Sequence, residues 1–178
     1  MKIEFTKATI DDVDKLIDVQ NQSFYADFVK YGECPGYNHS KESMTNIVLN
    51  KISYKIICNN QIVGDIIIRD NNDSTYFLGG ICVIPDYENK GIGQEAVKFI
   101  ESQFPNATVW TLETPADKKR NHYFYKKMGY TIVKEYMDSS VKVVLFKKEI
   151  NSTSYLMATY CNTPNSIKVG DNSSYAPR

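Results

Sequence analysis

The stretch that decides the fold reads Ile81-Cys82-Val83-Ile84-Pro85-Asp86-Tyr87-Glu88-Asn89-Lys90-Gly91-Ile92-Gly93-Gln94-Glu95-Ala96. An apolar, strand-like run ends at Pro85, because proline lacks the N–H group that a strand ladder needs. A short polar loop follows, and Gly91 and Gly93 open a segment with helical periodicity. The first N–H groups of a helix have no intrahelical acceptor and lie at the positive end of the helix dipole. This loop is therefore expected to bind a phosphate or pyrophosphate group.

The same residues also match a dinucleotide-binding fingerprint. Gly91, Gly93 and Ala96 fit G-x-G-x-x-A. Glu113 follows about 20 residues later, where proteins with this fingerprint have an acidic residue that binds the ribose. In that fold the glycines follow the strand almost directly, whereas residues 85–90 intervene here. The preceding elements are also antiparallel hairpins, so the context disfavours a dinucleotide fold.

Length and charge narrow the class of protein. The chain has 178 residues, of which 42% are hydrophobic and 24% charged, which favours one domain with its own core. We expect that domain to span residues 1–149, with 150–178 as a tail or surface extension rich in Asn, Ser and Thr. Twenty-one Lys+Arg balance 21 Asp+Glu, which argues against a dedicated nucleic-acid binder.

Several functions are disfavoured by what the sequence lacks. No apolar run approaches the roughly 20 residues of a membrane helix, and residues 1–5 do not resemble a secretory signal. Cys34, Cys58, Cys82 and Cys161 form no C-x-x-C pair, and there are two His. We therefore expect a reduced, cytoplasmic protein without a metal site.

Hydrophobic periodicity predicts an α/β domain with a mixed sheet, in the order β-α-α-β-β-β-α-β-α-β-β. The expected strands are 2–7, 54–58, 61–69, 75–84, 107–113, 130–136 and 141–147. The expected helices are 9–24, 40–52, 91–104 and 118–128. Residues 24–39 are expected to form an aromatic-rich loop or a broken helix.

Two segments together resemble the GNAT superfamily of N-acetyltransferases. Ile81-x-Val83-x-Pro85 followed by residues 88–93 resembles that family's acetyl-CoA signature, a strand L-x-V-x-P and a loop R/Q-x-x-G-x-G/A. Residues 121–130, Asn-His-Tyr-Phe-Tyr-Lys-Lys-Met-Gly-Tyr, resemble its second signature, N…(F/Y)-Y-x-K-x-G-(F/Y). The resemblance implies a GNAT-like, mostly antiparallel and splayed sheet, flanked by about four helices.

The resemblance implies acetyl-CoA as co-substrate and assigns the residues that hold it. Asn121 is expected to hydrogen-bond the pantetheine arm or nearby backbone, and Tyr125 to protonate the departing thiolate. The remaining expected cofactor contacts are backbone groups of Cys82, Val83, Asn89, Lys90, Gly91, Ile92, Gly93 and Gln94. Glu88 departs from the family's Arg or Gln, and its negative charge is expected to weaken pyrophosphate binding.

Acetyl transfer to an amine also requires a group that removes a proton from the amine. Glu113, at the end of a predicted strand, is the first candidate, and Asp65, Tyr76 and His39 are weaker ones. Gly79 and Gly80 indicate either close approach of a ligand or a β-bulge, which leaves a water relay open.

The acceptor is expected to be a small cationic molecule with a primary amine. In this family residues 24–39 would build its pocket, and their aromatic side chains suit a cation lying against ring faces; the candidates are Phe24, Tyr25, Phe28 and Tyr31. A protein or peptide acetyltransferase and a non-catalytic acyl-CoA-binding module remain alternatives. A homodimer, through the final hairpin or the tail, is left open.

Overall fold

A computed structural model describes residues 1–150 of the chain; the predicted tail, 150–178, lies almost wholly outside the described residues. The helices and strands follow one another in the predicted order. Their bounds are β1 Ile3–Lys7, α1 Val13–Tyr31, α2 Lys41–Asn50, β2 Ile52–Cys58, β3 Gln61–Asp70, β4 Thr75–Val83, α3 Ile92–Gln103, β5 Val109–Pro115, α4 Lys119–Lys127, β6 Thr131–Asp138 and β7 Val141–Glu149. Single 3₁₀ turns, Ile10–Asp12 and Pro85–Tyr87, precede α1 and α3.

The strands form one seven-stranded sheet in the order β1-β2-β3-β4-β5-β7-β6. All neighbouring pairs are antiparallel except β4 and β5, which confirms the mixed, mostly antiparallel sheet. The β2–β3 turn contains Asn59 and Asn60 with φ of 49° and 62°. Asparagine tolerates this left-handed backbone, so the hairpin forms where the sequence predicts it.

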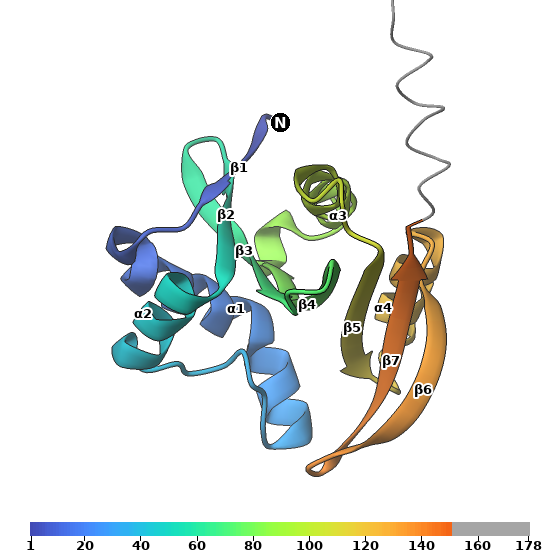
Figure 1. The fold of residues 1–178 in the computed structure, drawn as a ribbon. Helices are drawn as coiled ribbons and strands as arrows, with labels where there is room; N and C mark the ends of the chain where they lie inside the picture. The colour runs from blue at the N-terminus through green and yellow to red at the C-terminus, as the bar shows by residue number, and fades with distance from the viewer. Residues whose placement is uncertain (151–178) are drawn as a thin grey trace, which may run out of the picture.

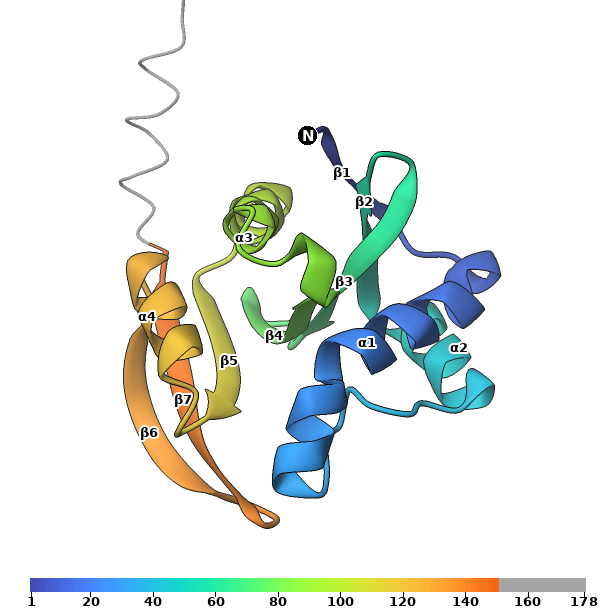
Figure 2. The same cartoon turned by 180° about the vertical axis from the view of Figure 1, so that it is seen from behind.

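Helices cover both faces of the sheet. The larger core lies between the sheet and α3, whose buried residues are Ile92, Ala96, Val97 and Ile100. Burying each larger side chain of this stripe contributes about 2 kcal/mol. On the opposite face Val13 and Leu16 of α1 pack with Met44 of α2 in a smaller core. Figures 1 and 2 show α1 and α2 side by side, well apart from α3.

The first helix is longer than predicted. Residues 24–31 continue α1 instead of forming a loop, because no helix breaker precedes Gly32. Gly32 ends the helix with φ of 76°, and its N–H donates to the Phe28 C=O. Figure 2 shows that α1 bends along its length, and Ser23 Oγ donates to the Val19 C=O, a contact that often bends helices. Ile52, expected at the end of the second helix, instead begins β2.

The feature that positions the site is the separation of β4 from β5. Thr75–Leu78 pair in parallel with Val109–Leu112, and the pairing stops there. Next to this point Gly79 is the extra residue of a β-bulge, since Ile67 pairs with Gly80 and Ile68 with Leu78. Beyond the bulge β4 pairs only with β3, so its other edge is open. Figure 1 shows β5, β7 and β6 as a curved group that leaves β4 on one side.

Candidate active site

A central cavity of about 690 Å³ lies where the two halves of the sheet separate. Its walls come from α1, the loop after α1, α2, β3, β4, β5, α4 and the β6–β7 turn. The ionisable residues among its lining are Asp27, Tyr31, Glu33, Cys34, His39, Lys51, Asp65, Glu113, Tyr125 and Asp138. Carboxylates thus outnumber basic groups on these walls, so the potential inside the cavity is negative.

The loop before α3 presents free backbone N–H groups, as expected. Gly91 precedes α3 with φ of 81°, and Asn89 has φ of 58°. Among the described residues, the N–H groups of 89–93 donate to no backbone acceptor, whereas Gln94 N–H already donates to the Gly91 C=O. A Cβ at Gly93 would lie 3.3 Å from Phe124, so this helix start lies directly against α4. The site thus offers partial positive charge beside the helix that carries Tyr125.

The unusual acid of this loop has a basic partner. Arg120 Nη1 donates to Glu88 Oε2 at 2.9 Å, and its Nη2 donates to Asn89 Oδ1 at 2.8 Å. A guanidinium has five N–H donors, so Arg120 keeps others for an anion. Arg120 therefore offsets the charge that led us to expect weakened pyrophosphate binding.

The open edge of β4 presents its main chain to the cavity side. Ile84 N–H donates to Val63 of β3 at 2.8 Å, and adjacent residues of a strand direct their N–H groups to opposite edges. Val83 N–H therefore points to the open edge. The Cys82 C=O faces Gly64 of β3, where an added Cβ would lie 2.2 Å from that oxygen.

Tyr125 projects from α4 into the wall of the central cavity. Its ring packs against Phe124, Tyr130 and Phe146, with centroids 5.0–5.9 Å apart. Burial raises the pKa of Tyr125 to about 12, which keeps its hydroxyl protonated at neutral pH. Asn121, one turn earlier, donates to Thr114 Oγ1 at 3.0 Å. This bond ties α4 to the end of β5.

Asp65 lies in a buried polar cluster on the opposite wall. Its Oδ2 accepts from Gln20 Nε2 at 2.6 Å, and its Oδ1 accepts from Cys82 Sγ at 2.8 Å. Burial raises the pKa of the Asp65 carboxyl to about 6, against the effect of both hydrogen bonds. Burial also raises the pKa of the Cys82 thiol, so this cysteine is a hydrogen-bond donor here and not a thiolate.

Glu113, the first candidate for the base, lines the cavity at an exposed position. Its carboxylate accepts a hydrogen bond from Tyr136 of β6, and this bond raises the pKa of Tyr136 to about 12. Of the weaker candidates, His39 lines the cavity, while Tyr76 packs against Trp110 and Phe104 in the core.

The predicted acceptor residues separate into two groups. Phe24 and Tyr31 line the central cavity. Tyr25 is 57% exposed and lines a different, shallow hollow beside Pro85, and Phe28 stacks on Tyr37 with centroids 4.5 Å apart. A helix directs adjacent side chains to different faces, so residues that neighbour one another in the sequence do not share one wall.

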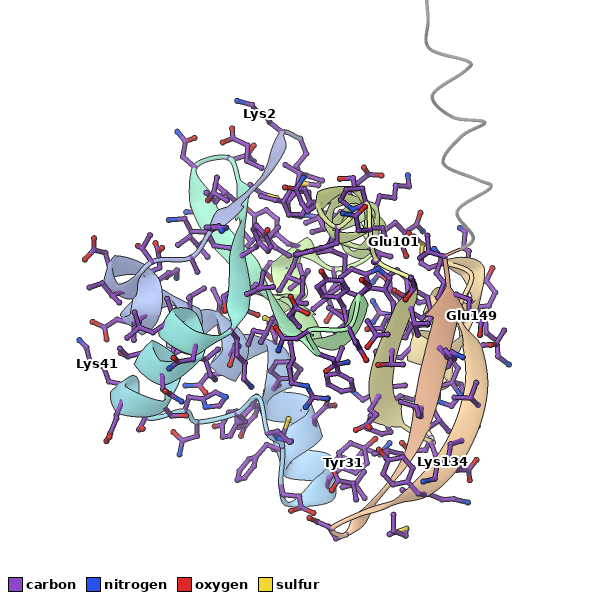
Figure 3. All side chains as sticks on the ribbon, in the orientation of Figure 1. Lys2, Tyr31, Lys41, Glu101, Lys134 and Glu149 are labelled. Atoms are coloured by element: carbon purple, nitrogen blue, oxygen red, sulfur yellow. The ribbon has the colours of Figure 1, made fainter. Side chains whose placement is uncertain are left out.

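Polar contacts close the cavity between α1 and the second half of the sheet. Tyr31 donates its hydroxyl to Asp117 Oδ1 at 2.6 Å, and Lys30 forms an ion pair with the same carboxylate. Farther along, Glu33 accepts hydrogen bonds from Ser140 at the β6–β7 turn. Figure 3 shows Tyr31 between the end of α1 and the β6–β7 hairpin. These contacts bridge α1 and the second half of the sheet along one side of the cavity.

Sequence analysis missed two residues of this site. Gln20 lies on the apolar stripe of α1, and a glutamine at such a position was the available signal. Arg120 has no local signal, because its partners lie 31 and 32 residues away.

The described part of the chain shows neither a metal-binding cluster nor a membrane-spanning helix. Residues 1–150 contain no group of three or more His, Cys, Asp or Glu side chains arranged to hold a metal ion. None of the helices described is both long enough and apolar enough to span a bilayer.

Comparison with known proteins identifies the family. The family model described as the acetyltransferase (GNAT) family matches residues 15–130. The chain is 34% identical over 113 residues to the uncharacterized protein YrkN of Bacillus subtilis (strain 168), an alignment that covers 60% of each chain.

Solved structures share the fold at low identity. The PaiA N-acetyltransferase of Thermoplasma acidophilum, solved with coenzyme A, is 20% identical with a TM-score of 0.69; the match covers 84% of this chain and 100% of that one. The ribosomal-protein-S18-alanine N-acetyltransferase of Escherichia coli is 13% identical with a TM-score of 0.68, covering 84% and 94%. The chain therefore belongs to the GNAT family of acetyltransferases, and the resemblance, the fold and the acetyl-CoA co-substrate inferred from its sequence are those of this family.

Proposed function

We propose that this protein transfers the acetyl group of acetyl-CoA to the primary amine of a small cationic molecule, with Tyr125 as general acid. The observation that carries the proposal is that Tyr125 lines a carboxylate-rich cavity, which also takes in residues of β4 next to its open edge. Direct attack by the amine then requires no covalent enzyme intermediate.

The cofactor is held mainly by main-chain groups. The N–H groups of 89–93 bind the pyrophosphate, assisted by the positive end of α3 and by Arg120. The pantetheine arm lies along the open edge of β4 as an added strand, with Val83 N–H available to it and Cys82 beside it. Asn121 adds a hydrogen bond at the junction with α4. This arrangement directs the thioester toward Tyr125.

Tyr125 acts when the carbon–sulfur bond breaks. The amine nitrogen attacks the thioester carbonyl carbon, the electron pair of that bond leaves on sulfur, and the phenol proton moves to the thiolate. With a pKa of about 12, the phenol of Tyr125 is protonated at neutral pH and carries the proton that this step needs. The carboxylate of Glu113, at an exposed position of the cavity lining, attracts the cationic amine.

The walls of the cavity favour a small acceptor over a protein. Phe24 and Tyr31 offer ring surfaces to a cation, and Tyr31 and Glu33 are hydrogen-bonded to the second half of the sheet. A protein acetyltransferase needs an open groove that admits an extended peptide, and these contacts cross the place where such a groove would run.

A panel of amines, assayed by thiol release from acetyl-CoA, tests the proposal. It should contain alkyl amines, diamines, aminoglycosides, amino acids and peptides with free N-termini. We expect turnover with small cationic amines and at least tenfold lower kcat/KM with peptides. Preference for peptides would favour the protein acetyltransferase, and tight acetyl-CoA binding without turnover would favour a non-catalytic module.

A further inference from the structure

One buried carboxylate in the wall of the central cavity lacks a cationic partner. Asp65 is 3% exposed, and no Lys, Arg or His of the described residues forms an ion pair with it. Lys55, its neighbour across the β2–β3 ladder, instead binds Asp12 through contacts of 2.8 and 2.9 Å. A buried charge without a counter-charge is costly. This position therefore suits a ligand that brings a positive charge.

Gln20, which lies beside Asp65, has a hydrogen-bond acceptor without a partner. Gln20 is 2% exposed, and its Nε2 is committed to Asp65. Its Oε1 is buried without a hydrogen-bond partner, which is uncommon for a buried polar atom. Gln20 and Asp65 both line the central cavity, so a ligand that enters it lies next to both side chains.

We infer that Gln20 and Asp65 together bind the primary ammonium group of the acceptor, and that Asp65 removes its proton. An ammonium group carries one positive charge and three N–H donors. The pair supplies one negative charge, the free Gln20 Oε1 and the unused lone pairs of the carboxylate. This inference rests on the proposed function, which requires an amine in the cavity, and it names the residues that recognise and deprotonate that amine.

The proton balance of the step is complete. The ammonium gives one proton to an Asp65 oxygen, which leaves a lone pair on nitrogen for attack on the thioester carbonyl. After the carbon–sulfur bond breaks, Tyr125 protonates the sulfur and recovers the second proton of the attacking nitrogen. The proton held by Asp65 then leaves to water, so the products are the amide, the free thiol and one proton.

Other charged groups around Asp65 are either paired or on other walls. Cys82 faces it from β4 as a neutral thiol, and Lys55 of β2 is held by Asp12. On α1, Asp27 forms an ion pair with Lys118. The remaining ionisable lining of the cavity comprises Tyr31, Glu33, Cys34, His39, Lys51, Glu113, Tyr125 and Asp138. Because burial raises the pKa of Asp65 to about 6, the carboxylate is ionised at neutral pH and can still accept a proton.

The decisive experiment compares kcat/KM against pH for the wild type and Asp65→Asn, using the best amine of the panel. The wild type should reach a plateau above about pH 6, where Asp65 is ionised and the amine is still protonated. At pH 7, kcat/KM of Asp65→Asn should be at least 100-fold below that of the wild type. It should then rise about tenfold per pH unit, because only amine that is already neutral in solution can react. Its KM for acetyl-CoA should stay within twofold.

Asp18→Asn is the matched control, since Asp18 is an exposed α1 carboxylate paired with Lys15, outside the cavity. It should keep the wild-type profile. A loss below threefold in Asp65→Asn, or a loss of equal size at every pH, overturns the inference. The inference is also overturned if the fall of kcat/KM below about pH 6 disappears in Glu113→Gln and is retained in Asp65→Asn.

A binding measurement separates this inference from the proposed function. Protein with ¹³C-labelled aspartate carboxyls is titrated with n-butylamine hydrochloride and with n-butanol, a neutral molecule of similar shape. The Asp65 signal, assigned by its absence in Asp65→Asn, should move with the ammonium and not with the alcohol. A shift of the Asp65 signal without any acetylation contradicts the proposed function and supports the ammonium site. Acetylation without a shift supports the proposed function and contradicts the ammonium site.

Discussion

The two proposed ends of the active site are built in opposite ways. In our proposal, the cofactor end uses the main chain of one continuous stretch, residues 83–93, together with one turn of α4. The acceptor end uses side chains from α1, β3, β5 and the β6–β7 turn, which are far apart in the sequence. Main-chain groups would suit the part of the co-substrate that is common to the family, whereas side chains can change to suit one acceptor. The first end can therefore be predicted from a motif, and the second cannot.

The largest loss of activity is expected on changing Tyr125, where the two ends meet. Tyr125→Phe removes only the hydroxyl, so kcat should fall 10²–10³-fold, or about 3–4 kcal/mol, while the dissociation constant of acetyl-CoA stays within threefold. Tyr123→Phe on the same helix is the control, because Tyr123 is 72% exposed. Steady-state kinetics and calorimetry measure both quantities. Unchanged turnover in Tyr125→Phe would remove the general-acid role.

At the acceptor end, the buried charge of Asp65 should lower the free energy of unfolding. The folded-state pKa of Asp65, about 6, lies above its ordinary value, so this group stabilises the fold at low pH and loses that contribution as pH rises through about 6. Asp65→Asn should therefore be more stable than the wild type at pH 8, by up to about 3 kcal/mol. The difference should disappear by about pH 4. Urea unfolding at both pH values measures it, and a variant less stable at pH 8 would mean that the carboxylate is a structural requirement.

The cofactor end should respond to charge at Gly91. Gly91→Asp and Gly91→Asn place side chains of equal size on a left-handed backbone that both tolerate, and only the first adds a negative charge beside the phosphate. Gly91→Asp should weaken acetyl-CoA binding about 30-fold, or about 2 kcal/mol, and Gly91→Asn by less than fivefold. Equal affinities for the two variants, measured by calorimetry, would contradict the pyrophosphate position.

The smallest effect concerns the pair that links the loop to α4. Arg120→Ala should weaken acetyl-CoA binding about fivefold, or about 1 kcal/mol, because Glu88 then faces the pyrophosphate without a partner. Adding Glu88→Gln to that variant should restore most of the affinity. Calorimetry at low and high salt is the measurement, and the difference should shrink as salt rises. A double variant as weak as Arg120→Ala would show that Glu88 does not act through its charge.

The fold was largely accessible to sequence reasoning because its signals are local. Asn59 and Asn60 mark a hairpin, Ser40 caps α2 by accepting from Ser43 N–H, and Gly91 begins α3. The prediction failed at residues 24–31, where an aromatic-rich loop or a broken helix was expected and α1 is continuous. Helix formation there depends on the absence of a breaker before Gly32 and on contacts with distant elements, such as Tyr31 with Asp117.

By itself, the sequence determined the order of the elements and the family. It also determined the glycine-rich start of α3 and the position of Tyr125, four residues before Gly129. Those features depend on backbone geometry and on spacings within one segment, which a chain carries whatever surrounds it. Only the tertiary structure decided that Gln20 meets Asp65 across 45 residues, that Arg120 pairs with Glu88, and that Tyr25 and Phe28 lie away from the cavity. Burial and hydrogen-bond partners are properties of the packed chain, because they depend on which residues the fold brings within a few ångströms of one another.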